Sequence, residues 1–179
     1  THIEALAEFV LEGRYDAGLA FDGDADRCLA VDENGTLVDG DVIMAILATS
    51  LQQRGLLRED TLVATVMSNL GLFKLGEKSG IHIETTKVGD RYVLERMRRR
   101  GLSLGGEQSG HVILLEHMTT GDGQPSAVQL LSALRHSGKK LSELAEVMDV
   151  YPQVLRGIRA DGVMKAALTV DEGVRKISA

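Results

Sequence analysis

Three aspartates alternate with small residues in one short loop, Asp22-Gly23-Asp24-Ala25-Asp26, and Arg27 follows them directly. Carboxylates this close repel one another, and a divalent cation relieves that repulsion. Because the loop offers oxygen ligands and no His or Cys, it suits Mg²⁺ better than Zn²⁺. A solvated acidic turn is the simpler alternative, but it is less favoured for three carboxylates beside an arginine. The loop therefore predicts a magnesium site next to which Arg27 could hold a phosphoryl oxygen.

Two other motifs share part of this pattern. When the loop is counted as an EF-hand from Asp22, Glu33 falls on a ligand position, but Arg27 stands where the turn requires glycine. A haloacid-dehalogenase nucleophile motif fits less well, because Asp26 occupies the place of a hydroxyl or β-branched residue. Both motifs stay open as minor alternatives.

A glycine-rich loop, Gly105 to His111, carries a second set of polar groups. Glu107 and Ser109 can present an acceptor and a hydroxyl to neighbouring sugar hydroxyls, and the glycines allow close backbone approach. A plain β-turn explains the same residues equally well. Upstream, Gly89-Asp90-Arg91 has the composition of a helix start, with Asp90 as the predicted N-cap and Arg91 solvated.

The elements that must position these loops follow from the apolar periodicity and from capping and turn residues. Helices are predicted over residues 1–13, 42–54, 70–78, 91–100, 122–135 and 141–148. Strands are predicted over residues 17–21, 28–31, 36–38, 62–66, 81–85, 102–105 and 112–115. The pair Asn34-Gly35 predicts a hairpin between residues 28 and 38. Helices and strands alternate from residue 41 onward, which indicates an α/β layered domain.

The elements group into one complete unit, residues 39–150. The first forty residues supply one helix, one strand and a hairpin, which is too little for a core of their own. Residues 153–179 suggest one strand and one helix, and we interpret them as a linker into a further domain.

Composition narrows the class of protein. The 179 residues carry a net charge of −6, which argues against nucleic acid as a partner. The basic cluster Arg96 and Arg98 to Arg100 is interpreted as the last turn of a helix, where cations complement the dipole. No apolar run approaches the roughly 20 residues that span a bilayer, and no signal sequence opens the chain, so we expect no membrane partner and a cytoplasmic location. The single cysteine, Cys28, agrees with a reducing compartment.

Four ordered motifs together resemble the α-D-phosphohexomutases. The loop at 22–27 resembles the metal loop of that family, and Thr86 to Arg91 resembles a substrate loop. Gly105 to His111 resembles the sugar-binding loop, in the Glu-Gln-Ser-Gly-His form typical of the phosphoglucosamine mutase branch. The stretch Thr119 to Gly123 is also characteristic.

The resemblance implies a fold and a domain division. It implies a three-layer α/β/α domain with a mixed sheet, flanked by partial domains. Residues 1–38 would be the end of domain 2 with the metal loop, 39–150 the whole of domain 3 with the sugar-binding loop, and 151–179 the linker and start of domain 4. We therefore expect an internal fragment, without the serine nucleophile loop and the phosphate-binding loop of the family, and inactive by itself.

The resemblance also implies roles for the site residues. Mg²⁺ would be held by Asp22, Asp24 and Asp26, and Arg27 would steady the phosphoryl group that passes between a phosphoserine and the sugar. The sugar hydroxyls would be held by Glu107 and Ser109. The loop Gly89 to Arg91 would also contact the substrate, and His111 would act nearby in proton transfer.

The expected substrates are glucosamine phosphates and a sugar bisphosphate, for synthesis of amino-sugar nucleotides and cell-wall precursors. A phosphomannomutase or phosphoglucomutase fragment is the first alternative. A non-catalytic module that binds metal or sugar phosphate is the second, because the chain contains no recognisable nucleophile.

Overall fold

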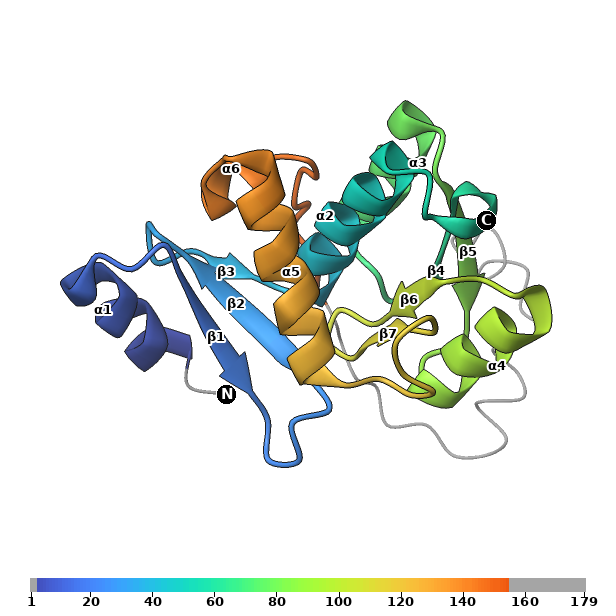
Figure 1. Ribbon diagram of the computed structural model, residues 1–179. Coiled ribbons are helices and arrows are strands. Elements are labelled where there is room, and N and C mark those ends of the chain that lie inside the picture. Colours follow the sequence, from blue (N-terminus) through green and yellow to red (C-terminus); the bar gives the residue numbers. More distant parts are fainter. Residues whose placement is uncertain (1–2, 155–179) are drawn as a thin grey trace.

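A computed structural model describes residues 3–154 of the chain as a mixed α/β structure (Figure 1). Its elements in order are α1 (Ile3–Gly13), β1 (Ala17–Phe21), β2 (Cys28–Asp32), β3 (Leu37–Val38), α2 (Gly40–Gln53), the 3₁₀ helix η1 (Arg58–Asp60), β4 (Thr61–Thr65), α3 (Leu70–Ser79), β5 (His82–Thr86), α4 (Asp90–Arg100), β6 (Leu104–Gly106), β7 (Val112–Leu114), α5 (Gly123–Ser137) and α6 (Leu141–Ala145). None of the helices in this part of the chain is both long and apolar enough to cross a membrane.

A small antiparallel sheet has the strand order β1-β2-β3. The predicted hairpin around Asn34-Gly35 is confirmed, with Val31 opposite Leu37. The sheet also contains β1, whose Phe21 pairs with Cys28, so the acidic loop is a tight connection between two paired strands. On the side of Gly18, the side chains of Leu6 and Val10 from α1 lie close to the backbone, while Ala17 and Leu19 pack toward the main core.

The larger sheet has the order β5-β4-β6-β7 and is mixed. Strand β4 runs parallel to β5 and β6, whereas β7 is antiparallel to β6. All of β4 is buried, and its side chains alternate between two clusters. Leu62 and Ala64 join the main core with α2 and α3, whereas Val63 joins Val93 and Met97 under α4. Burial on both faces of one sheet produces three layers, and the predicted α/β/α architecture is confirmed.

Several local predictions need correction. Asp90 is the first residue of α4 and not its N-cap; the cap position is Gly89, whose φ of 126° suits glycine. Helix α6 ends at Ala145 instead of Met148. The helix at Asp122 is confirmed, because that side chain accepts a hydrogen bond from the Gln124 N–H. The strand and helix expected within 153–179 lie almost wholly outside the described residues.

One acid is fully buried in the first turn of α2. Asp41 has no exposed surface, and burial raises its pKa to about 6, an effect that Asp39 reinforces and that the hydrogen bond from the Asn69 N–H only partly offsets. The ordinary pKa of an aspartate, which we take for the unfolded chain, is 3.8. Between these values the folded state keeps a proton that the unfolded state has lost, so folding stability decreases as pH rises through this window.

We expect Asp41→Asn to remove this pH dependence. Relative to the variant, the wild type should lose about 2 kcal/mol of unfolding free energy between pH 4 and pH 7. Urea denaturation of both proteins across that range measures the difference. A difference that stays constant with pH would contradict the raised pKa.

Candidate active site

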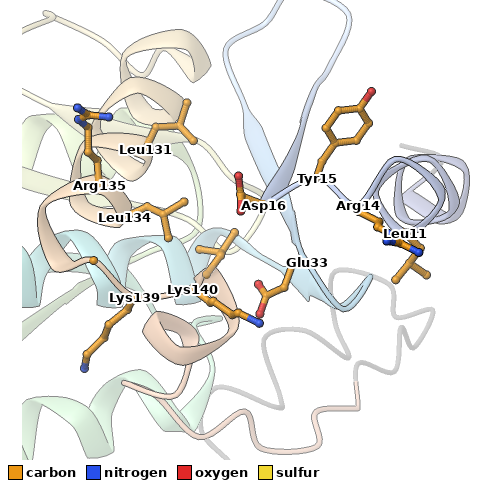
Figure 2. Close-up of a pocket in the computed structure, with 12 residues that line it drawn as sticks. Leu11, Arg14, Tyr15, Asp16, Glu33, Leu131, Leu134, Arg135, Lys139 and Lys140 are labelled. Atoms are coloured by element: carbon orange, nitrogen blue, oxygen red, sulfur yellow. The ribbon is translucent and has the colours of Figure 1, made fainter.

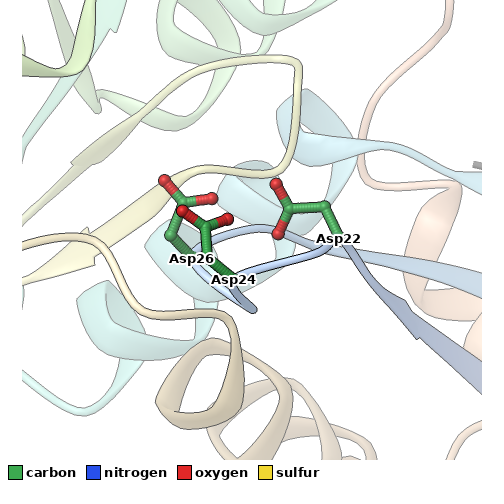
Figure 3. Close-up of side chains that lie close together, drawn as sticks. All are labelled: Asp22, Asp24 and Asp26. Carbon is green, nitrogen blue, oxygen red and sulfur yellow. The ribbon is translucent and has the colours of Figure 1, made fainter.

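The acidic loop gathers its three carboxylates on one side of the β1–β2 connection (Figure 3). One oxygen each from Asp22, Asp24 and Asp26 lies within 4.8 Å of the others. The turn is closed by the Ala25 N–H, which donates to Asp22 O at 3.2 Å, and Ala25 has a φ of 59°. The flanking elements are strands, so the EF-hand alternative, which requires helices, is wrong.

Arg27 lies against the same carboxylates. Its backbone N–H donates to Asp22 Oδ1 at 3.2 Å, and its Nε lies 3.5 Å from Asp22 Oδ2 and 3.6 Å from Asp26 Oδ1. Partial burial by itself raises the pKa of Asp22, but the Arg27 backbone N–H, Asp26 and the Arg27 charge outweigh it. The pKa of Asp22 therefore lies below its ordinary value, and this carboxylate is ionised at neutral pH.

The donor set suits a hard divalent cation. All three candidate ligands offer oxygen, the donor type that Mg²⁺ prefers. Within residues 3–154, Asp26 Oδ1 is buried and has no hydrogen-bond partner, which is costly for a carboxylate oxygen unless something else satisfies it. These residues therefore fit Mg²⁺.

His111 joins the glycine-rich loop to the acidic loop. Its Nδ1 lies 3.0 Å from Asp26 Oδ2, across 85 residues of sequence. Its Nε2 is 3.9 Å from Asp90 Oδ2 and is buried, with no hydrogen-bond partner in the described part of the chain. A Cβ at Gly121 would come within 2.1 Å of that nitrogen, so only glycine permits the approach. His111 thus contacts three of the four motif loops.

The glycine-rich loop is held from several sides. Glu107 Oε1 accepts the Gly89 N–H at 2.8 Å, which ties the loop to the start of α4. The Cys28 N–H donates to Gly110 O at 3.0 Å, which ties it to β2. Ser109 is exposed at the loop surface. One carboxylate oxygen of the half-buried Glu107 is therefore already used, whereas the Ser109 side chain is exposed.

The fourth loop packs directly beneath the acidic loop. The Gly123 N–H donates to Ala25 O at 2.9 Å, and a Cβ at Gly123 would stand 2.6 Å from Arg27 O. The structure thus brings all the predicted site residues to neighbouring loops on one side of the molecule. The side chain of Arg91 is exposed and makes no hydrogen bond within residues 3–154.

Sequence reasoning missed the residues that support the glycine-rich loop. Asp39 caps α2 through the Val42 N–H at 3.1 Å, and its other oxygen accepts from Gln108 Nε2 at 3.2 Å. The Gly40 N–H donates to Gln108 O at 3.0 Å. The run Asp39-Gly40-Asp41 before an apolar helix was a signal for the cap, but nothing in the sequence links it to Gln108.

Figure 2 shows a cavity of about 630 Å³ with the residues that line it. It is lined by side chains that include Tyr15, Glu33, Leu134 and Lys140. Tyr15 precedes β1 and Glu33 follows β2, whereas the acidic loop joins the other ends of these strands. The cavity is therefore at the opposite end of the small sheet and is separate from the candidate site.

The three-layer domain and its loops define a phosphohexomutase domain. Residues 39–151 match the family model "Phosphoglucomutase/phosphomannomutase, alpha/beta/alpha domain III", and the chain belongs to this family. The chain is 59% identical over 172 residues to the phosphoglucosamine mutase of Acetivibrio thermocellus, which covers 96% of this chain and 38% of that protein. The chain therefore spans little more than a third of the length of this curated relative.

Solved structures agree on the fold. A Thermus thermophilus protein assigned as a phosphomannomutase superposes with a TM-score of 0.74 at 28% identity, over 81% of this chain and 33% of that one. N-acetylphosphoglucosamine mutase of Aspergillus fumigatus, solved with GlcNAc-6P and magnesium, gives a TM-score of 0.59 at 22% identity, over 76% and 33%. At that identity the second likeness shows the fold alone.

Proposed function

We propose that the chain is part of a magnesium-dependent phosphoglucosamine mutase, which interconverts glucosamine 6-phosphate and glucosamine 1-phosphate. The observation that carries this proposal is the contact between His111 Nδ1 and Asp26 Oδ2 at 3.0 Å, which joins the acidic loop to the glycine-rich loop. The name of the relative from Acetivibrio thermocellus supports the choice of glucosamine phosphates. The magnesium in the Aspergillus fumigatus complex supports the choice of metal.

The acidic loop would serve the transferring phosphoryl group. Asp22, Asp24 and Asp26 would hold Mg²⁺, which supplies charge neutralisation for phosphoryl transfer when it is bound. Arg27 is half exposed and lies beside Asp22 and Asp26. Its guanidinium would donate to an oxygen of the transferring phosphoryl group, and such fixed charges are the main requirement of this chemistry.

The other loops would serve the sugar. Glu107 and Ser109 would hold sugar hydroxyls, and the Gly89 to Arg91 loop, fixed to Glu107 through the Gly89 N–H, would complete the pocket. His111 Nδ1 contacts Asp26, and its buried Nε2 lies 3.9 Å from the exposed carboxylate of Asp90, so a proton exchanged between His111 and a sugar hydroxyl would pass through Asp90.

The complete reaction needs parts beyond this chain. A serine phosphate would give its phosphoryl group to the free sugar hydroxyl, and the bisphosphate would return its other phosphoryl group to the serine after reorientation. We propose that residues 1–38 end domain 2, residues 39–150 form domain 3 and residues 151–179 lead into domain 4. The domain that carries the serine would lie outside these residues.

The isolated chain is therefore expected to show no mutase turnover. A coupled assay for glucosamine 1-phosphate, with Mg²⁺ and glucosamine 1,6-bisphosphate, compares the chain with the full-length protein. Turnover is expected in the full-length protein alone. Turnover by the isolated chain that Asp24→Asn abolishes would contradict this division of the reaction.

A further inference from the structure

A buried polar contact joins two segments that the proposed reaction does not use. Asp41, in the first turn of α2, has no exposed surface, and its Oδ2 accepts the Asn69 N–H at 2.6 Å. A hydrogen bond from a neutral donor to an ionised carboxylate is among the stronger ones. Burying a carboxylate also has a large desolvation cost. A protein that retains a buried carboxylate can use it to specify one arrangement of the segments that it joins.

Asn69 carries the contact onward to the segment that follows α6. Its side-chain amide bonds to both backbone polar groups of Tyr151. Nδ2 donates to Tyr151 O at 2.8 Å, and Oδ1 accepts the Tyr151 N–H at 3.0 Å. Oδ1 also accepts the Gly71 N–H and so caps α3. Asn69 is 2% exposed, so water does not compete freely for these bonds.

Two neighbouring contacts hold the same segment. Gln153 Nε2 donates to Met67 O at 2.9 Å. A Cβ at Gly71 would stand 1.8 Å from Asp149 O, so the backbone at residue 149 lies directly on the first turn of α3. We call residues 149–153 the exit segment, because the match to the family domain ends within it.

The first turn of α2 is attached at its other end to the glycine-rich loop. Asp39 and Gly40 both bond to Gln108. A Cβ at Gly40 would stand 2.2 Å from Glu107 O, so this loop lies against the helix start without space between them. One helical turn thus contacts Glu107 on one side and, through Asn69, the exit segment on the other.

We propose that Asp41 and Asn69 are positioning residues that fix the exit segment relative to the glycine-rich loop. For its effect on substrate, this inference rests on the proposed function. Any part of the longer protein that follows residue 153 would then be held at a defined position relative to the bound sugar. If the exit segment lost this position, substrate binding would weaken more than the chemical step would slow, because the reacting groups near the acidic loop keep their places.

Amide hydrogen exchange of the 179-residue chain tests the contact without any substrate. The Tyr151 N–H donates to Asn69 Oδ1, so its exchange rate reports directly on the contact between Asn69 and the exit segment. In Asp41→Ala we expect Tyr151 exchange to accelerate about tenfold. Asp41→Asn keeps an acceptor for the Asn69 N–H and should stay close to the wild-type rate.

A second variant and a matched control guard against general unfolding. Asn69→Asp keeps the cap to the Gly71 N–H but has no donor for Tyr151 O, so it should also accelerate Tyr151 exchange. Val93→Ala removes buried methyl groups under α4. It should accelerate the Leu102 amide, which bonds to Met97 O, and not the Tyr151 amide. Equal effects of Asp41→Ala, Asn69→Asp and Val93→Ala on Tyr151 would overturn the proposal.

Kinetics of the full-length protein test the link to the sugar. Asp41→Ala should raise KM for glucosamine 6-phosphate about tenfold with a much smaller change in kcat. Asp41→Asn should keep KM close to the wild-type value. A kcat effect as large as the KM effect would overturn the positioning role. If the wild-type protein does not turn over glucosamine 6-phosphate, the proposed function fails. The exchange experiment still decides whether Asp41 and Asn69 hold the exit segment.

Discussion

Asp24→Asn is expected to abolish most Mg²⁺ binding by the chain. Asp24 is exposed and makes no hydrogen bond within the described residues, whereas Asp22 and Asp26 also hold Arg27 and His111. The substitution therefore removes a ligand charge without disturbing the loop. Because a hard cation in an exposed site depends on the ligand charge, affinity should fall by about tenfold or more. In the full-length protein, turnover should fall by about 10² to 10³.

Calorimetric titration of Mg²⁺ into the wild-type chain and the variant measures the change. Asp16→Asn is a matched control, because Asp16 is exposed, precedes β1 at the end away from the loop, and changes the net charge by the same amount. The control should bind Mg²⁺ like the wild type. Equal affinities for wild type and Asp24→Asn would remove this carboxylate from the metal site.

Glu107→Ala is expected to have the largest effect on sugar turnover. Glu107 both faces the proposed sugar site and accepts the Gly89 N–H at 2.8 Å, so its loss frees two substrate loops together. The specificity constant for glucosamine 6-phosphate in the full-length protein should fall by about 10² to 10³. In Ser109→Ala the specificity constant should fall only about tenfold, because the exposed hydroxyl supports no other loop.

Glu107→Gln separates the two roles of this residue. The amide oxygen can still accept the Gly89 N–H, so the loops stay joined while the charge that would bind sugar hydroxyls is removed. We expect an intermediate specificity constant and unchanged Mg²⁺ affinity. Near-normal specificity constants in both Glu107→Ala and Ser109→Ala would refute the assignment of this loop to the sugar.

The sequence predicted the fold best where the signal was local. Apolar periodicity located every helix from α1 to α6, and Asn34-Gly35 located the hairpin, because each depends on residues close in the chain. Errors arose where a backbone conformation outweighed composition. At the start of α4 the residue type favoured Asp90 as cap, but the chain turns at Gly89 with a φ of 126°, which a side chain would oppose.

The candidate site could be predicted as a list of residues but not as an arrangement. The family motifs pointed to the four loops, and the alternating aspartates suggested a cation site by themselves. The contact between His111 and Asp26 spans 85 residues and depends on how the two sheets pack. The pairing of β1 with β2 was likewise hidden, since the polar residues between these strands resemble an ordinary loop.

The buried network was the least predictable part. Asp41 has the residue type of an exposed helix start, yet it is fully buried and accepts a hydrogen bond from Asn69 in the loop before α3. Its partner Asn69 is recognisable as a helix cap, but its bonds to Tyr151 span 82 residues. Long-range closure of this kind is set by packing and leaves no periodic signal.

The most direct test of the proposed function is the specificity of the full-length protein that contains this chain. Specificity constants for glucosamine 6-phosphate, mannose 6-phosphate and glucose 6-phosphate should be measured with Mg²⁺ and the matching bisphosphate activator. We predict a clear preference for glucosamine 6-phosphate, with turnover that disappears on removal of Mg²⁺ by a chelator and returns when Mg²⁺ is restored. A preference for mannose or glucose phosphates, or turnover that a chelator does not affect, would contradict the account.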